Sequence, residues 1–231
     1  MNKELLIFGS NGALGKGVTS VMIKKNYDKI YLFDFNFETK YDRKNIEQVV
    51  IKDLSIENNI IDAFKTIMPG KDKILFLFST VGGFAGGKYI WETDEMEIDK
   101  MIGMNFKTNF LIAKHFSKIV KESAAGSICF TAAFTGLREE KKKSAYGAAK
   151  GSLIHLVKTL ASEGEEINLS ANAIAPFIID TPANREWMKE ADTGTWMKPA
   201  EIGELIHFMF DSFHFISGNV IQLTKRFKVT L

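Results

Sequence analysis

The first fifteen residues constrain the fold most, because an apolar run ends there in a glycine-rich turn. Residues 4–9 form a short, largely apolar run, which is typical of a buried strand. The turn 10–15 follows, and the periodicity of residues 13–26 predicts a helix. A strand, glycine turn and helix form the unit that binds a dinucleotide pyrophosphate at the helix N-terminus. The spacing of Gly9, Gly12 and Gly15 differs, however, from Gly-x-Gly-x-x-Gly.

Strand-like and helix-like segments alternate along the whole chain. This pattern predicts right-handed crossovers and a parallel sheet. We therefore expect a single domain, 1–231, with a doubly wound Rossmann-type α/β sheet of about seven strands and helices on both faces. The link from 34 to 49 has too little periodicity to predict a helix. The predicted strands are 4–9, 29–34, 48–53, 73–79, 126–131, 168–175 and 219–223, and the predicted helices are 13–26, 56–67, 93–122 (broken near Gly103), 144–164 and 200–211.

The second predicted strand ends in an acid, Asp34, which lies 19 residues after Gly15. A carboxylate at that place accepts hydrogen bonds from both hydroxyls of an adenosine ribose and repels a 2′-phosphate. Asp34 therefore predicts NADH rather than NADPH as the cofactor. An ordinary acid at the end of a strand is the alternative interpretation.

Tyr146 and Lys150 lie four residues apart at the start of the predicted helix 144–164. That spacing places both side chains on one helix face. We expect the lysine ammonium to favour the phenolate and to pull the tyrosine pKa toward neutrality, as acid–base catalysis requires. An unrelated surface Tyr and Lys would give the same spacing.

Together these features resemble the short-chain dehydrogenase/reductase family over nearly the whole chain. Asp53 and Leu54 resemble its adenine-contacting pair, and 81–83 takes the place of its Asn-Asn-Ala-Gly segment. Asn105 matches an asparagine that helps to hold a proton-relay water, and 176–181 resembles the nicotinamide loop, with Phe177 in place of a glycine. The resemblance implies Tyr146, Lys150 and Asn105 as catalytic residues, and Gly9, Asn11, Gly12, Leu14, Gly15, Asp34, Asp53, Leu54, Val81, Gly82, Gly83, Tyr146, Lys150, Pro176 and Thr181 as cofactor-binding residues.

One position departs from the family pattern. The serine that polarises the substrate usually lies 13 residues before the tyrosine, and that position is Ala133 here, with Thr131 and Thr135 on either side. The dihydropteridine reductases of the family also lack this serine, and the segments 9–15, 82–87 and 180–185 resemble theirs. This resemblance implies a quinonoid dihydropterin as the hydride acceptor, although Asn105 matches the wider family better than that branch.

Aromatic residues accompany the predicted catalytic pair. Phe84, Trp91, Trp187 and Trp196 are expected near the mouth of the site, where aromatic faces suit a flat ring. We expect Phe84, Ala133 and Trp187 to contact the substrate and the segment 181–198 to form a lid that orders when the cofactor binds. The charged run 139–143 is interpreted as a solvated loop, with a basic substrate gate as the weaker alternative.

Two other functions fit the same sequence. One is the reduction or oxidation of another small carbonyl or alcohol, with Thr131 or a water in place of the missing serine. The other is a redox sensor that binds a dinucleotide without turnover, although such a sensor has no need of Tyr146, Lys150 and Asn105. No two of the four histidines have the spacing of metal ligands, so no metal site is predicted.

Composition excludes several classes of protein. With 30 basic and 28 acidic residues, the chain gives no signal for nucleic-acid binding, and no apolar run is long enough for a membrane span. A single cysteine, Cys129, favours a reducing cytoplasm. Apolar positions on the helices 93–122 and 144–164, among them Phe106, Phe110, Leu111 and Phe116, predict a homodimer in which these helices pair. Three cations in the tail 224–231 argue against a tetramer.

Overall fold

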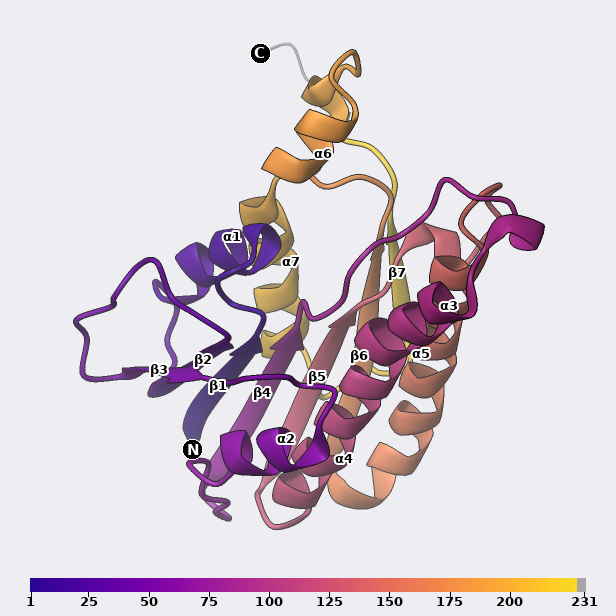
Figure 1. The fold of residues 1–231 in the computed structure, drawn as a ribbon. Helices are drawn as coiled ribbons and strands as arrows, with labels where there is room; N and C mark the ends of the chain where they lie inside the picture. Colours follow the sequence, from indigo (N-terminus) through magenta and orange to yellow (C-terminus); the bar gives the residue numbers. More distant parts are fainter. Residues whose placement is uncertain (228–231) are drawn as a thin grey trace.

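Seven parallel strands form one sheet in the spatial order β3-β2-β1-β4-β5-β6-β7 (Figure 1). The computed structural model describes residues 1–227. The predicted doubly wound parallel sheet is therefore confirmed, and strand order reverses direction between β1 and β4, which is where ligands bind in such sheets. The strands are β1 (Asn2–Phe8), β2 (Lys29–Asp34), β3 (Ile46–Val50), β4 (Lys73–Ser79), β5 (Ala125–Thr131), β6 (Leu169–Pro176) and β7 (Val220–Leu223).

The sheet is covered on both faces, as parallel sheets are. In Figure 1, α1 and α7 lie on one face, whereas α2, α4 and α5 lie on the other, with α3 beside α5. The central strands are accordingly rich in apolar residues, and Leu5 to Phe8 of β1 are fully buried. The helices are α1 (Ala13–Met22), α2 (Glu57–Phe64), α3 (Glu95–Ile102), α4 (Thr108–Lys121), α5 (Ser144–Gly164), α6 (Pro182–Trp187) and α7 (Pro199–Asp211).

A single π-helical turn, Gly103–Lys107, joins α3 to α4. The Gly103 carbonyl accepts the backbone N–H of Thr108, and the Thr108 hydroxyl donates to the same carbonyl at 3.0 Å. The predicted break in the long helix near Gly103 is thus confirmed. The turn places Asn105 inside the molecule, where it is fully buried.

The link between β2 and β3 contains no helix among its residues 35–45. Phe37 and Tyr41 from this link pack instead against the core between the sheet and α1 and α7. The weak periodicity of this link thus corresponds to a loop, and Figure 1 shows that the loop extends beyond β3.

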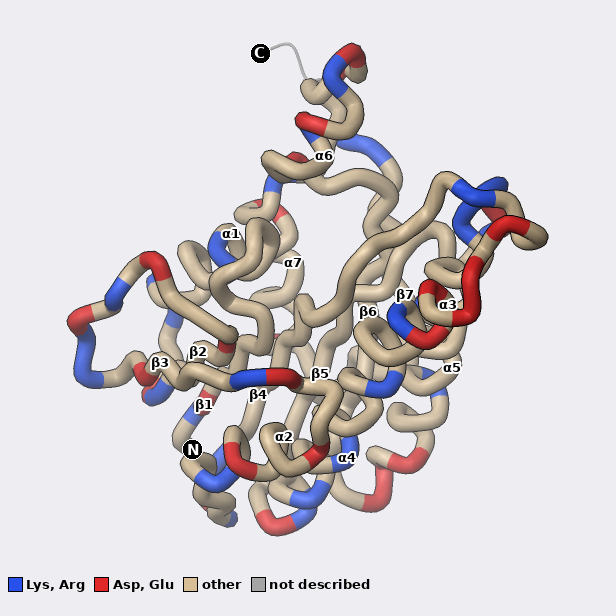
Figure 2. The backbone as a smooth tube through the Cα atoms, in the orientation of Figure 1, with Lys and Arg blue, Asp and Glu red and all other residues tan. Residues whose placement is uncertain are grey.

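Charges of both signs are interspersed over the molecule, as Figure 2 shows. In the described part of the chain, no helix is sufficiently long and apolar to cross a bilayer. The predicted domain 1–231 and the cationic tail 224–231 both extend into residues 228–231, which lie outside the described residues.

Candidate active site

Two adjoining cavities lie at the carboxyl ends of the central strands and share Thr80 and Gly82 in their walls. The outer cavity, about 580 Å³, lies beside the end of β2. The inner cavity, about 550 Å³, lies between α5, β6 and α6. Of the residues predicted from the sequence, the outer cavity is lined by Gly9, Gly12, Asp34, Asp53, Leu54, Val81 and Gly82, and the inner cavity by Leu14, Gly82, Gly83, Phe84, Asn105, Ala133, Tyr146, Lys150, Pro176 and Trp187.

Three predicted cofactor residues line neither cavity. The backbone N–H of Asn11 donates to Asp34 Oδ2 at 2.7 Å, so Asn11 holds a residue of the cavity wall in place. Gly15 lies beneath the turn, where a Cβ would collide with the carbonyl of Gly9. Thr181 caps α6 by accepting a hydrogen bond from the Asn184 N–H at 3.2 Å.

The glycine turn brings backbone close to both cavities. Gly9 has a φ of +78°, a left-handed conformation that favours glycine, and a Cβ there would collide with Thr80 Oγ1. The Thr80 hydroxyl donates to the Gly9 carbonyl at 2.9 Å and fastens the turn to the end of β4. Gly12 caps α1 without a side-chain hydrogen bond, and the first turn of α1 carries no acid. Its terminal N–H groups can therefore face an anion.

Asp34 is held rigidly at the end of β2. Its carboxylate accepts N–H groups from Asn11 at 2.7 Å and from Phe35 at 2.8 Å, one on each oxygen. The side chain is buried and lines the outer cavity. Each oxygen keeps a second lone pair, with which a ribose hydroxyl could pair.

Tyr146 and Lys150 both line the inner cavity, and burial dominates their chemistry. Lys150 Nζ donates to the Thr131 carbonyl at 2.7 Å and lies 5.9 Å from the centre of the Tyr146 ring. Burial lowers the pKa of Lys150 to about 7. Burial, and secondly the Glu140 charge, raise the pKa of Tyr146 to about 12. Our expectation that Lys150 lowers the pKa of Tyr146 is therefore wrong for this structure, because burial and the Glu140 charge both act in the opposite direction.

Two asparagines one helical turn apart fix the backbone beneath this pair. Asn105 Nδ2 donates to the Gly83 carbonyl at 2.9 Å, and its Oδ1 accepts the Gly83 N–H at 3.2 Å. Asn109 Nδ2 donates to the carbonyls of Val81 at 3.0 Å and Asn105 at 2.9 Å. Sequence analysis missed Asn109, although the Asn-x-x-x-Asn spacing was a usable signal. A Cβ at Gly82 would lie 2.5 Å from Asn105 Oδ1 and 3.1 Å from Lys150 Nζ, so glycine allows this close approach.

Aromatic side chains form one wall of the inner cavity. The Phe84 ring meets Tyr146 edge-on at 5.0 Å and Trp187 at 5.6 Å between ring centres. Of the four aromatic residues expected near the mouth, Phe84 and Trp187 lie there. The other two do not, because Trp91 stacks on Tyr89 at the surface, and Trp196 is buried and lines neither cavity.

The charged run 139–143 is not merely solvated, which corrects our interpretation. Glu140 and Lys143 line the inner cavity with Thr135. The Thr135 hydroxyl donates to Glu140 Oε2, and Lys143 Nζ lies 3.0 Å from Glu140 Oε1. The Gly87 N–H donates to the Lys142 carbonyl at 2.8 Å, which ties this loop to the one after β4. No local sequence pattern carries that long-range contact.

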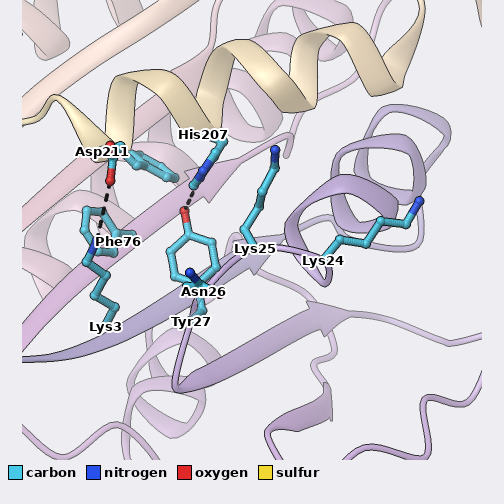
Figure 3. Close-up of a pocket in the computed structure, with 9 residues that line it drawn as sticks. Lys3, Lys24, Lys25, Asn26, Tyr27, Phe76, His207 and Asp211 are labelled. Atoms are coloured by element: carbon cyan, nitrogen blue, oxygen red, sulfur yellow. Dashed lines mark hydrogen bonds and ion pairs between the residues drawn. The ribbon is translucent and has the colours of Figure 1, made fainter.

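A smaller cavity of about 200 Å³ lies near the amino ends of the strands, between the end of α1 and α7 (Figure 3). Two of its three lysines form ion pairs, Lys3 with Asp211 at 3.5 Å and Lys25 with Glu204 at 2.7 Å. His207 Nδ1 lies 3.2 Å from the Tyr27 hydroxyl, a structural contact visible in Figure 3. Within residues 1–227, His, Cys, Asp and Glu form no group that could hold a metal ion.

Comparison with known proteins gives the family. A sequence profile of the short chain dehydrogenase family matches residues 3–192. Dihydropteridine reductase of Dictyostelium discoideum is 29% identical, covering 100% of this chain and 98% of that protein. Carbonyl reductase family member 4 of Xenopus laevis is 25% identical over 96% of both chains. The solved structure of ElxO with NADP bound superposes with a TM-score of 0.84 at 21% identity, over 97% of this chain and 98% of that one. The chain therefore belongs to the short chain dehydrogenase family and is an NAD(P)-dependent oxidoreductase.

Proposed function

We propose that this enzyme is an NADH-dependent reductase that transfers a hydride to a quinonoid dihydropterin. Tyr146 donates the proton, and Lys150 assists it. The observation that carries this proposal is the inner cavity, which combines Tyr146 with an aromatic wall and has an alanine, Ala133, in place of a hydroxyl. A dihydropteridine reductase is also among the relatives that match over the full length, at 29% identity.

The residues present fit a dinucleotide. The N-terminus of α1 has unpaired donors for the pyrophosphate, and Asp34 offers acceptors for the adenosine ribose. Asp53, Leu54 and Val81 form the surrounding wall of the outer cavity, on the adenine side. Preference for NADH rests on the negative charge of Asp34, since a 2′-phosphate beside it would be repelled. The NADP bound to the structural neighbour ElxO belongs to that protein and leaves this preference to be measured.

The hydroxyls near Ala133 favour a substrate that does not need them. Thr131 Oγ1 donates to the Ser79 carbonyl at 2.9 Å, and the Thr135 hydroxyl donates to Glu140. Both donors are therefore occupied, and neither is free to polarise a substrate carbonyl. A quinonoid ring accepts hydride without such a donor, whereas a simple ketone loses this assistance.

The proton chemistry follows from burial. When bound, NADH supplies the hydride. With its pKa raised to about 12, Tyr146 stays a phenol at neutral pH and holds the proton that the reduced ring needs. Lys150 is oriented by the Thr131 carbonyl, and its position beside Gly82 suits a contact with the nicotinamide ribose. Asn105 keeps the segment at Gly83 in place beneath the reacting groups.

Reduction of another small carbonyl remains the second candidate, because Carbonyl reductase family member 4 is also similar over nearly the full length. A dinucleotide sensor is the third. A turnover screen separates all three: purified enzyme is supplied with NADH or NADPH and with quinonoid dihydropterin or a panel of ketones. We expect NADH oxidation with the dihydropterin to exceed that with any ketone. Turnover with ketones alone would support the second candidate, and tight dinucleotide binding without turnover would support the third.

A further inference from the structure

The carboxylate of Glu140 is a charged group in the inner cavity that the mechanism above does not use. It belongs to the loop before α5 and lines the cavity together with Tyr146. The Thr135 hydroxyl donates to Oε2, and Lys143 Nζ lies 3.0 Å from Oε1. One donor on each oxygen fixes the plane of the carboxylate, while each oxygen retains a second lone pair.

Glu140 is charged at neutral pH. Burial acts to raise the pKa of this carboxyl, but hydrogen bonds from Thr135 and Lys143 outweigh it, and the pKa is lowered. The charge extends into the cavity, since it helps to raise the pKa of Tyr146. Lys143 balances the carboxylate only from one side, with its Nζ also 5.9 Å from the centre of the Phe84 ring.

We propose that Glu140 determines substrate specificity by accepting two adjacent N–H groups from the edge of a flat heterocycle that packs against the aromatic wall of Phe84 and Trp187. This inference rests on the proposed function and deepens it. A fused aminopyrimidinone carries such an edge, because its exocyclic amino group lies next to a ring N–H. A carboxylate receives two parallel N–H donors in a bidentate, charge-assisted arrangement. A ketone without N–H groups offers this carboxylate no partner.

The alternative role for Glu140 is purely structural, as a brace between Thr135 and Lys143. The two roles predict different behaviour toward ligands. A brace affects all ligands alike when it is weakened, whereas a recognition group changes the ratio between ligands that differ only at the edge it contacts.

The test compares 6,7-dimethylpterin with 6,7-dimethyllumazine, in which an oxygen replaces the 2-amino group. Affinities are measured by isothermal titration calorimetry on the enzyme saturated with NAD⁺. The variants are Glu140→Gln and, as a matched control, Glu139→Gln. The Glu139 side chain is exposed and lies outside the inner cavity. Thr135→Val is a further variant that keeps the charge of Glu140 but removes one of the donors that hold it.

We expect the wild type to prefer the pterin by about 10–100-fold, the scale of a charged hydrogen-bond pair. Glu139→Gln should keep this ratio. Glu140→Gln should abolish or reverse it, because an amide offers one donor and one acceptor and so matches the lumazine edge. Thr135→Val should reduce the ratio partially, with folding of all variants checked by thermal denaturation.

An unchanged ratio in Glu140→Gln would overturn the role of Glu140 while leaving the proposed function intact, provided that quinonoid dihydropterin is still turned over. If the wild type neither binds the pterin nor reduces the dihydropterin, the proposed function fails, and this inference fails with it. Equal weakening of both ligands in Glu140→Gln would establish the structural brace instead.

Discussion

Single residues in the inner cavity derive their chemistry mainly from desolvation. Lys150 has its Nζ on one backbone carbonyl, and burial lowers its pKa to about 7. Burial, and secondly the Glu140 charge, raise the pKa of Tyr146 to about 12. The pair therefore begins as a phenol beside an amine that titrates near neutrality, a state suited to proton donation during reduction.

Removal of the Tyr146 hydroxyl tests its role as acid. Tyr146→Phe should cut kcat by roughly 10²–10⁴-fold, the usual scale for a positioned acid, and leave NADH affinity nearly unchanged. The matched control is Tyr89→Phe, which removes a hydroxyl from the surface loop after β4. Steady-state kinetics and NADH titration measure both effects. A wild-type rate in Tyr146→Phe would assign the proton to solvent or to another residue.

Lys150 should also make stability depend on pH. Its folded-state pKa is about 7 against a usual 10.5, so below pH 7 the folded protein carries a charge in a desolvated place. This cost disappears as the pH rises to 10.5, because there the unfolded chain also loses the proton. Lys150→Met should therefore raise Tm by roughly 5 °C at pH 6, with the difference shrinking toward pH 10.

The same variant should lose most activity, since the amine is gone. Lys158→Met, on the exposed side of α5, is the matched control and should leave Tm nearly constant at every pH. Thermal denaturation between pH 6 and 10 gives the comparison. A Tm difference that stays constant with pH would show that burial does not perturb Lys150.

Cofactor preference should depend on the charge of Asp34. Asp34→Ala should narrow the kcat/KM ratio of NADH to NADPH by about 10-fold or more, because it removes the ribose acceptor and the repulsion of a 2′-phosphate. Asp42→Ala, in the exposed β2–β3 link, should leave the ratio unchanged. Equal use of both cofactors by the wild type would contradict the assignment of Asp34.

At the scale of elements, α6 covers the inner cavity with little to hold it. This helix has only six residues, and Thr181 caps its N-terminus. Arg185 pairs with Asp180, with 2.8 Å between Arg185 Nη2 and Asp180 Oδ2. Trp187 at its end contributes to the aromatic wall. Figure 1 shows α6 standing beyond the carboxyl ends of the strands, in the place expected for a lid.

Limited trypsin digestion tests whether the cofactor orders this lid. NADH should slow cleavage after Lys189 several-fold, since contacts with a bound dinucleotide reduce local opening. Cleavage after Lys71, in the exposed turn before β4, should keep its rate and serves as the control. Mass spectrometry of the fragments follows both sites. Equal rates at Lys189 with and without NADH would mean that 181–198 is a fixed wall.

Elements with a local signal were predictable from the sequence, whereas contacts between loops were not. The strand, glycine turn and helix near the N-terminus needed only periodicity and glycine positions, although α1 ends at Met22 and not at the predicted residue 26. The helix break near Gly103 was found in the same way. The position of Glu140 depended on the pairing of the loop around Gly87 with the loop around Lys142, which no local pattern encodes. The predicted direction of the Tyr146 pKa shift was wrong for a related reason, since burial is a property of the packed molecule.

At the scale of the whole molecule, the burial of residues on α4 reduces the number of side chains that could form the predicted dimer interface. Leu111 and Phe116, which we had expected to contribute, are buried within the chain's own core. Phe110 is 45% exposed and contacts Phe106 at 6.0 Å between ring centres. These two rings remain available for a partner helix, and pairing of α4 and α5 with their copies stays a prediction.

Light scattering at micromolar concentration tests the dimer. We expect a mass about twice the 26.0 kDa of one chain. Phe110→Asp should shift it to one chain, because a charge in an apolar contact is costly. Phe215→Asp, which changes an exposed ring outside α4 and α5, should leave the mass unchanged. A wild-type mass near that of one chain would contradict the predicted interface between paired helices.

The loop that replaces a helix between β2 and β3 has a consequence for the order of events in turnover. A dinucleotide seated beside Asp34 borders the link 35–45, where no helix closes over it. At its other end, the inner cavity lies beneath α6 and continues into the outer cavity through Thr80 and Gly82. We therefore predict that the cofactor enters from this side and forms part of the floor on which the substrate rests, so that binding is ordered, with the dinucleotide the first to bind and the last to leave.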